Sequence, residues 1–599
     1  MVASGSLPKP FHLGYRALRD TTMFRNLLRT RLVQNILHLK ALAGNPGYRE
    51  WNSREKAEFE RFCSQLGGAK LGAKLLPPGK HKRALVHHVT IPYVKLQVLL
   101  EKALQTAGFE CVTVGARSRD FLRYDWLLGN SAGYLFSDFD ISGDPEWVER
   151  QMPRLMSTRD WLGLRYRNVR VGQFVIATAL RWRMVGQLDF TDGTARSMLA
   201  ELLNASVRNV IAASDLLDEV QPDCLLLMDR GYSGAGELFD LALHRRLDVI
   251  TWNFGYKSNR LVLKRYNSDN DRDHPLCPSA ASWSQVRTAA WNPSYGDAIR
   301  QELFDCYESG DLFSFSGTQF NKKILSRDAT RRELGLAADK KVAVIFPHIL
   351  WDGSFFYGED LFEDYTEWLV ETIKAACDND RVQWVVKLHP AHVVKAEREN
   401  YRGKPAELVA LEGVVETLPE HVKLVHPGDS ISTYSLLETA DYVVTVRGTV
   451  GIEAALLGVP VVTGGTGRYD RRGFTIDSSS QEEYKARLAK LETYPPLTKD
   501  QIELAERYAY YVFLCRPLRL SCASLEYARD AKASPIVTVH CNSPEEWAKS
   551  PDVVSLGEWF RNGVDEDFIG APFDAIASER AQPLEHATGT PARESTCVT

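Results

Sequence analysis

Short apolar runs alternate with helix-patterned segments through the second half of the chain. The runs between residues 340 and 465 are KKVAVIFPHIL, VQWVVKLHP, HVKLVHP, DYVVTV and VPVVTGG. Such runs separated by helices are typical of a doubly wound parallel sheet, because two parallel strands need a crossover connection, which a helix supplies. The alternation therefore predicts a Rossmann-like domain over residues 331–500.

A second, less regular alternation precedes it. The apolar runs ALVHHVTI (84–91), FECVTVG (109–115), CLLL (224–227) and DVITWNFG (248–255) read as strands, and helix-patterned segments lie between them. We predict another parallel α/β domain over residues 81–330, in which the polar stretch 261–330 bridges to the next domain. The predicted fold class is α/β with two Rossmann-like domains.

The two ends of the chain read differently. We predict a helical appendage over residues 1–80, a crossing helix with a C-terminal extension over 501–570, and a disordered tail over 571–599 that is rich in Ala, Ser, Pro, Thr and Glu. Residues 23–42 carry apolar residues at helical spacing and unopposed cations. This helix either contacts an anionic membrane surface peripherally or packs on the domain as an ordinary helix.

Composition excludes several classes of protein. With 599 residues and a net charge of −4, the chain offers no global charge for nucleic-acid binding. None of its ten cysteines forms a CxxC pair, which argues against a zinc ribbon or a dithiol redox site. We predict no metal and no cofactor. Reduced cysteines, and the lack of a long uncharged apolar run or a signal peptide, favour the cytoplasm.

The segment Asp441–Val462 reads as strand, loop, helix and strand. Thr449 can cap the helix, where free backbone N–H groups attract an anion. Gly448 permits close approach of the backbone, and Arg447 adds positive charge. Glu453, one helical turn further on, can accept hydrogen bonds from ribose hydroxyls. The alternative is a plain connection without a ligand.

A second phosphate contact is predicted at the end of the strand that closes with Lys387, Leu388, His389 and Pro390. Ligands of open α/β sheets bind at the carboxyl ends of strands, so His389 is placed to donate to a phosphate. Pro390 ends the strand and stiffens the turn. Lys387 alternates with Leu388 and therefore faces the other side from it.

Two further loops follow strands in the same region. His426 and Ser430 form a candidate anion or base contact, for which a structural role is equally open. Gly465 and Arg468 belong to a glycine-rich loop that can touch a donor sugar or diphosphate, or can serve only as a flexible turn.

In the domain predicted over residues 81–330, Asp229 ends a strand before a glycine-bracketed turn. A carboxylate there can act as the general base for an acceptor hydroxyl, with Glu237 as the competing candidate. The alternative is that Asp229 only caps its loop. His87, His88 and His348 also lie at strand ends and are mostly expected to be structural.

KLHP (387–390) followed by DYVVTVRGTVGIEAALLGVPVVTGG (441–465) resembles the capsule polysaccharide biosynthesis family, which includes Kdo transferases. It is also similar to bacterial sialyl- and polysialyltransferases. The resemblance implies a GT-B-like fold with two facing Rossmann-like domains. It also implies a nucleotide-sugar donor, often CMP-activated, that is bound by the C-terminal domain without an obligatory metal.

Carried over by position, the resemblance implies that His389 and Thr449 contact the donor phosphate and that Glu453 contacts the nucleoside. Asp229-Arg230-Gly231 is similar to an acidic–acidic–Gly motif whose carboxylate is the catalytic base. Arg230 departs from that motif, because it occupies the second acidic position.

These readings predict a glycosyltransferase that transfers sugar from a nucleotide sugar to a saccharide or glycolipid acceptor of a capsule or other surface polysaccharide. Three alternatives stay open. They are a CDP-alcohol polyol-phosphate transferase of the teichoic-acid type, a sugar-nucleotide epimerase, and a non-catalytic scaffold of polysaccharide assembly.

Overall fold

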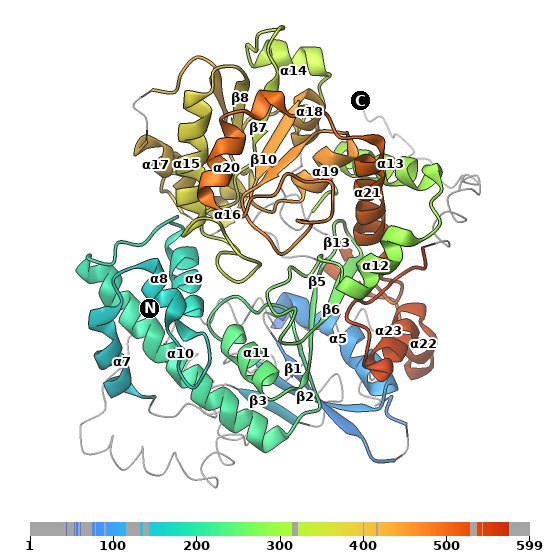
Figure 1. Cartoon of the computed structure of the whole chain (residues 1–599). Coiled ribbons are helices and arrows are strands. Elements are labelled where there is room, and N and C mark those ends of the chain that lie inside the picture. The colour runs from blue at the N-terminus through green and yellow to red at the C-terminus, as the bar shows by residue number, and fades with distance from the viewer. Residues whose placement is uncertain are drawn as a thin grey trace, which may run out of the picture.

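Figure 1 shows the computed structural model of the chain. The structure describes residues 75–77, 79–88, 91–115, 132–135, 143–313, 322–398, 401–414, 417–526, 536–541 and 543–573, and a few positions between 43 and 60. The predicted membrane-contacting segment 23–42 and most of the predicted tail 571–599 lie outside these residues.

A seven-stranded sheet organises what we call the N-terminal half, with the strand order β12-β6-β5-β4-β1-β2-β3. Its elements before residue 267 are β1 (Lys82–His87), α5 (Ile91–Thr106), β2 (Phe109–Gly115), β3 (Ala132–Leu135), α7 (Pro145–Gln151), η2 (Met152–Arg154), α8 (Thr158–Gly163), α9 (Val171–Arg183), α10 (Gly193–Val220), β4 (Cys224–Leu227), α11 (Ala235–His244), β5 (Asp248–Phe254) and β6 (Arg260–Tyr266).

Both faces of this sheet are covered. Along β1, Leu85 packs into a core with residues of α9 and α10, whereas Ala84 and Val86 pack into a second core with α5 and α23 (Pro551–Asn562). A strand buried on both faces reads as a continuous apolar run, which explains the pattern of CLLL in β4.

The prediction that this sheet is wholly parallel is wrong at one edge. β6 runs antiparallel to β5, and β12 runs antiparallel to β6. β6 occupies the beginning of the stretch 261–330, which was predicted to be a polar bridge. Its sequence appears polar because it contains Lys264 and Arg265. Their charges are paired inside the protein, with Asp567 and Asp248 respectively.

The C-terminal half is built on five parallel strands in the order β11-β10-β7-β8-β9. Its elements are α14 (Arg327–Glu333), β7 (Val342–Ile345), α15 (Tyr365–Asp378), β8 (Gln383–Lys387), α16 (Ala391–Arg398), α17 (Ala406–Glu412), β9 (Val422–Val425), α18 (Thr433–Thr439), β10 (Tyr442–Thr445), α19 (Val450–Leu456), β11 (Val461–Thr463), α20 (Gln481–Leu488) and η4 (Leu491–Thr493). The predicted α/β class with two Rossmann-like halves is confirmed.

Two connections join the halves. The first contains α12 (Ala280–Thr288) and α13 (Pro293–Ser309). The second contains α21 (Lys499–Ala509) and the π-helix η5 (Tyr510–Cys515), and it leads back into the C-terminal extension. The elements of the extension are β12 (Leu518–Arg519), β13 (Ala523–Glu526), β14 (Ile536–Val539), α22 (Pro544–Lys549) and α23.

The extension is part of the N-terminal half. β12 pairs with β6 through Leu518 and Leu261, and α23 packs along α5, as the lower right of Figure 1 shows. Residues from both ends of the chain therefore share one core.

The loop between β7 and α15 fastens the two halves together. Trp351, Phe355 and Phe362 of this loop belong to one apolar core that also includes residues of α9 and α10. Asp352 of the same loop accepts a hydrogen bond from the Tyr232 hydroxyl at 2.7 Å and pairs with Arg181, both from the N-terminal half. Within the described part of the chain, no helix is long and apolar enough to span a bilayer.

Candidate functional site

Polar side chains collect where three neighbouring parallel strands end. β10, β7 and β8 lie side by side, so their carboxyl ends share one edge of the sheet. Arg447 follows β10, His348 follows β7 and His389 follows β8. Two of the predicted site residues, Arg447 and His389, thus lie at the same edge of the sheet as His348, which was expected to be structural.

His348 is a neutral hydrogen-bond donor at this edge. Its Nε2 accepts the backbone N–H of Arg447 at 3.1 Å, and its ring stacks on Tyr365. Burial, with the charge of Arg447 next, holds the pKa of His348 well below its usual value. A neutral imidazole with an acceptor Nε2 carries its proton on Nδ1, and no described residue accepts that proton.

His389 is likewise neutral. Burial and the nearby cation Lys395 lower its pKa to about 4, and Asp352 offsets this only in part. Lys395 forms an ion pair with Asp352, the carboxylate that joins the two halves. His389 therefore lies beside the junction of the halves, in the position that the resemblance assigned to a phosphate contact.

Arg468, from the glycine-rich loop after β11, brings the main positive charge. Its guanidinium is 8% exposed, and its Nη1 donates to the Arg447 carbonyl at 3.2 Å. Its Nε has no hydrogen-bond partner, and no described carboxylate lies within ion-pair distance of it, although Glu453 acts on it electrostatically. Burial lowers its pKa. A buried charge without an ion-pair partner has a high desolvation cost, so this guanidinium is suited to bind an anionic ligand.

The N-terminal half contributes His274 from the loop between β6 and α12. Its Nδ1 accepts the Leu276 N–H at 3.1 Å, and its ring lies 4.7 Å from that of Tyr357. Burial, followed by Arg468 and Arg230, keeps its pKa well below the usual value. Its proton therefore sits on Nε2, where no described residue accepts it.

The N-terminal half also contributes the buried guanidinium of Arg230. It is 4% exposed and lies over the rings of Tyr266 and Tyr357, with its carbon 4.3 Å and 5.2 Å from their centroids. Its Nη2 donates to the Asp273 carbonyl at 2.6 Å. The residue in the motif's second acidic position is therefore held by aromatic rings and carbonyl groups.

Asp229 caps its own turn, as the alternative reading expected, and its role as a base stays a prediction. Its Oδ1 accepts the N–H groups of Arg230 at 2.6 Å and Gly231 at 3.1 Å, which caps the turn. Its Oδ2 accepts no hydrogen bond within the described ranges, and the side chain is half-buried. The carboxylate also acts electrostatically on Tyr232 and Tyr357.

Glu237 does not join this group, which corrects its prediction as the competing base. It is fully buried, and it lies in the first turn of α11, where its carboxylate reaches back to the N-cap residue Gly234. Its carboxylate accepts hydrogen bonds from Ser206, Ser233 and the N–H of Gly234. With both oxygens engaged between helices, it is a structural acid.

The hydroxyl of Thr449, in the turn before α19, does not have the predicted capping role. Thr449 occupies the N-cap position, but its hydroxyl makes no capping hydrogen bond. Instead it bonds Glu453, whose carboxylate also accepts the Tyr307 hydroxyl. Glu453 is buried, and burial raises its pKa. The predicted capping by Thr449 is therefore wrong, because its hydroxyl orients Glu453.

Arg447 is also more structural than predicted. It is 3% exposed, pairs with Asp360 and donates to carbonyls of the loop between β7 and α15. A Cβ on Gly465 would lie 2.4 Å from Arg447 Nη2, so that glycine makes room for the pair. Gly448 lies between Arg447 and Thr449, and Tyr469 donates to its carbonyl at 2.7 Å.

The remaining predicted contacts are Lys387 and Pro390 at the end of β8, and His426 and Ser430 in the loop after β9. Lys387 is 2% exposed, its Nζ has no partner among described residues, and burial and Lys322 lower its pKa to about 8. Pro390 directly follows His389 and precedes α16. His426 is exposed, and no contact within the described ranges joins it or Ser430 to Arg468.

Sequence reasoning missed His274, Tyr307 and Tyr357. His274 had a signal, since His274-Pro275 repeats the dipeptide of His389-Pro390. The two tyrosines had none, because they come from segments far from the motif. Within the described ranges, no group of three or more His, Cys, Asp or Glu side chains is placed to hold a metal ion.

The buried neutral histidines predict an acid-sensitive fold. His87 and His389 have pKa values near 4 in the folded protein and near 6.5 when unfolded, so only the unfolded state gains their protons between these values. The free energy of unfolding is then fully retained above pH 6.5. It falls by about 1.4 kcal/mol per pH unit per histidine as the pH drops toward 4.

Urea unfolding at pH 7, 6 and 5 measures this slope. His389→Asn is expected to make it shallower, whereas replacement of the exposed His244 leaves it unchanged. A flat profile, or the same slope in both variants, contradicts the assignment.

Comparison with known proteins bears on the C-terminal half. No curated protein matches the sequence. Among solved structures the chain is similar to Thermosulfurimonas dismutans KpsC, beta Kdo 2,4 transferase, at 15% identity over 50% of this chain and 82% of that one, with a TM-score of 0.31. It is similar to the UDP-GlcNAc 2-epimerase from Neisseria meningitidis at 12% identity over 72% and 97%, with a TM-score of 0.25.

The family comparison is more specific. Residues 335–503 match the family described as capsule polysaccharide biosynthesis protein. The matched segment contains His389, Thr449, Glu453 and Arg468. The predicted resemblance to the capsule polysaccharide biosynthesis family is thus confirmed for the C-terminal half of this chain.

Proposed function

We propose that the protein is a glycosyltransferase that moves a sugar from a nucleotide-sugar donor to a growing capsule or other surface polysaccharide or glycolipid. The observation that carries the proposal is the buried side chain of Arg468, which forms no ion pair with a described carboxylate and lies at the edge where strands of the sheet end. The family match of residues 335–503 supports the same reading.

The donor phosphate is assigned to Arg468, His348 and His389. A guanidinium forms strong charge-assisted hydrogen bonds with phosphate, and a neutral imidazole adds an N–H donor. The unshared Nδ1 proton of His348 and the unpaired charge of Arg468 are the groups that such an anion would satisfy. Lys387, buried and unpaired, is assigned to the donor nucleotide as well.

Glu453 is assigned to the nucleoside. Tyr307 and Thr449 orient its carboxylate, and a buried acceptor of this kind suits a ribose hydroxyl. The position one turn into α19 is the position that the sequence resemblance assigned to this contact.

Asp229 is assigned to the acceptor side. In the proposed reaction the acceptor hydroxyl attacks the anomeric carbon and transfers its proton to Oδ2 of Asp229. The bond from the anomeric carbon to the phosphate oxygen breaks, and Arg468 and the imidazoles stabilise the departing phosphate. Asp352, which pairs with residues of both halves, keeps the two sides of the reaction together.

A thermal-shift screen with CMP, UDP and GDP, each with its nucleoside as control, tests the proposal. A ligand at 100 times its dissociation constant is expected to stabilise the protein by about 2.7 kcal/mol. One nucleotide should raise the melting temperature, and its nucleoside should raise it much less. If no nucleotide at millimolar concentration changes the melting temperature, the proposed function is wrong.

Product analysis then separates the chemistries. A glycosyltransferase releases the nucleotide and forms a glycoside, whereas transfer from a CDP-alcohol leaves CMP and a phosphodiester. An epimerase changes the donor without an acceptor, and a scaffold binds without turnover.

A further inference from the structure

We propose that His274 is the N-terminal half's contact with the leaving phosphate, and that Asp567 of the C-terminal extension is the positioning residue for the loop that carries it. The inference rests on the proposed function, because it assigns one more group to the same anion. It adds a role for the last part of the chain, which lies outside the family match.

His274 reaches the phosphate-binding group through its own backbone. Its N–H donates to the Gly467 carbonyl at 2.9 Å, directly before Arg468. Arg468 and His348 both act electrostatically on its ring. With Nδ1 occupied by the Leu276 N–H, the Nε2 proton is the group that remains for a ligand. An anion between the halves would therefore meet donors from both of them.

Three buried cations hold the carbonyls on either side of His274. The pairs are Arg230 with Asp273 at 2.6 Å, Arg516 with Pro275 at 2.7 Å, and Lys264 with Cys277 at 2.9 Å. Every second carbonyl of the loop is therefore fixed by a charged donor. Backbone held in this way leaves the imidazole little freedom to move from its place.

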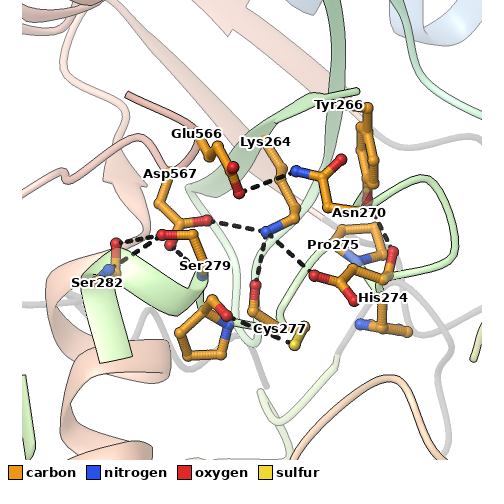
Figure 2. A network of polar contacts seen from close by, with 12 residues as sticks. Lys264, Tyr266, Asn270, His274, Pro275, Cys277, Ser279, Ser282, Glu566 and Asp567 are labelled. Carbon is orange, nitrogen blue, oxygen red and sulfur yellow. Dashed lines mark hydrogen bonds and ion pairs between the residues drawn. The ribbon is translucent and has the colours of Figure 1, made fainter. Parts of the chain in front are cut away.

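Asp567 ties two of these cations together. Figure 2 shows Lys264 between Asp567 and the loop that carries His274. Asp567 lies 3.2 Å from Lys264 Nζ and 3.2 Å from Arg516 Nη2, and it accepts the Ser279 N–H at 2.7 Å. These acidic and basic side chains are at most 1% exposed. Burial opposes ionisation of Asp567, but Arg516 and Lys264 outweigh it and lower its pKa.

Such a network is a poor source of stability. Removing ions from water costs several kcal/mol for each ion, and apolar residues of the same volume are often as stable or more so. What the network does is hold the backbone in place, since its charged donors fix the carbonyls on either side of His274 at defined positions. That is why we assign Asp567 to positioning.

The first experiment replaces His274 by alanine, with His244→Ala as the matched control on the exposed end of α11. Calorimetry compares CMP with cytidine, and UDP and GDP with their nucleosides. His274→Ala should weaken the bound nucleotide about tenfold to 100-fold, as expected for one charge-assisted hydrogen bond, and leave its nucleoside unchanged. A nucleotide-to-nucleoside preference equal to that of the wild type overturns the proposal.

The second experiment is a double-mutant cycle of His274→Ala with Asp567→Asn, read as turnover. If Asp567 acts through His274, the double variant is no slower than His274→Ala alone. If the two substitutions lower turnover by independent factors that multiply in the double variant, Asp567 has a separate structural role and the positioning assignment is wrong. If Asp567→Asn does not fold, Arg516→Lys replaces it in the cycle, because it keeps the charge and loses the guanidinium bond to Pro275.

The two proposals fail in different ways. If the wild-type protein binds no nucleotide, the proposed function is wrong. If the wild type binds a nucleotide and His274→Ala binds it equally well, only the assignment of His274 is wrong.

Discussion

Arg468→Met is expected to weaken nucleotide binding strongly while leaving the protein about as stable as the wild type. The guanidinium is buried and forms no ion pair with a described carboxylate, so a methionine of similar length removes a desolvation cost. The lost hydrogen bond to the Arg447 carbonyl offsets part of that gain, so we expect the free energy of unfolding to stay within about 1 kcal/mol of the wild-type value. Loss of a buried charged contact should weaken nucleotide binding by about 2–5 kcal/mol, roughly 30-fold to several thousand-fold.

Arg447→Met is the matched control. Arg447 is also buried but pairs with Asp360, so its removal leaves a buried carboxylate without its ion-pair partner. That change should lower the free energy of unfolding by about 3–5 kcal/mol. Urea unfolding and calorimetry on both variants give the comparison. If Arg468→Met loses stability as Arg447→Met does, Arg468 is a structural residue and the anion site is elsewhere.

Asp229→Asn is expected to lower turnover about 100-fold to 10,000-fold, the range for a lost general base, and to leave nucleotide affinity unchanged. The amide keeps an oxygen that can accept the N–H groups of Arg230 and Gly231, so the turn should persist. What is lost is the charge at Oδ2. Single-turnover kinetics with donor and acceptor, together with calorimetry, measure the two effects.

Two outcomes would count against this base. Loss of binding and turnover together would show that Asp229 only supports its turn. Turnover lost in Glu237→Gln with the fold intact would return the role to Glu237, although its carboxylate accepts hydrogen bonds from Ser206 and Ser233 inside the protein.

The fold of the C-terminal half could be predicted closely because its signals are local. The runs around β7, β8 and β10 are short, apolar and separated by helices, and strands buried on both faces must look like this. β6 escaped prediction because its strand pattern contains Lys264 and Arg265. The partner that allows Lys264 to be buried is Asp567, about 300 residues later.

The site could be predicted only in part for a similar reason. Strand ends are visible in sequence, so His389 and Arg468 were found as candidate anion contacts. Whether a charge is free or already paired is not visible. Arg447 and Glu237 read as site residues by position, yet Asp360 and two serines satisfy them.

By itself the sequence determined the class of fold and predicted the edge of the sheet that we propose as the ligand site, because periodicity and strand ends are local properties. Only the tertiary structure decided which polar groups are left without partners. It showed that, among the described residues, Arg447 forms an ion pair whereas Arg468 does not, and that the carboxylate of Glu237 is engaged by serines. It also showed that His274 lies close to Arg468. The physical reason is that the cost of a buried charge depends on what surrounds it, and those surroundings are assembled from distant parts of the chain.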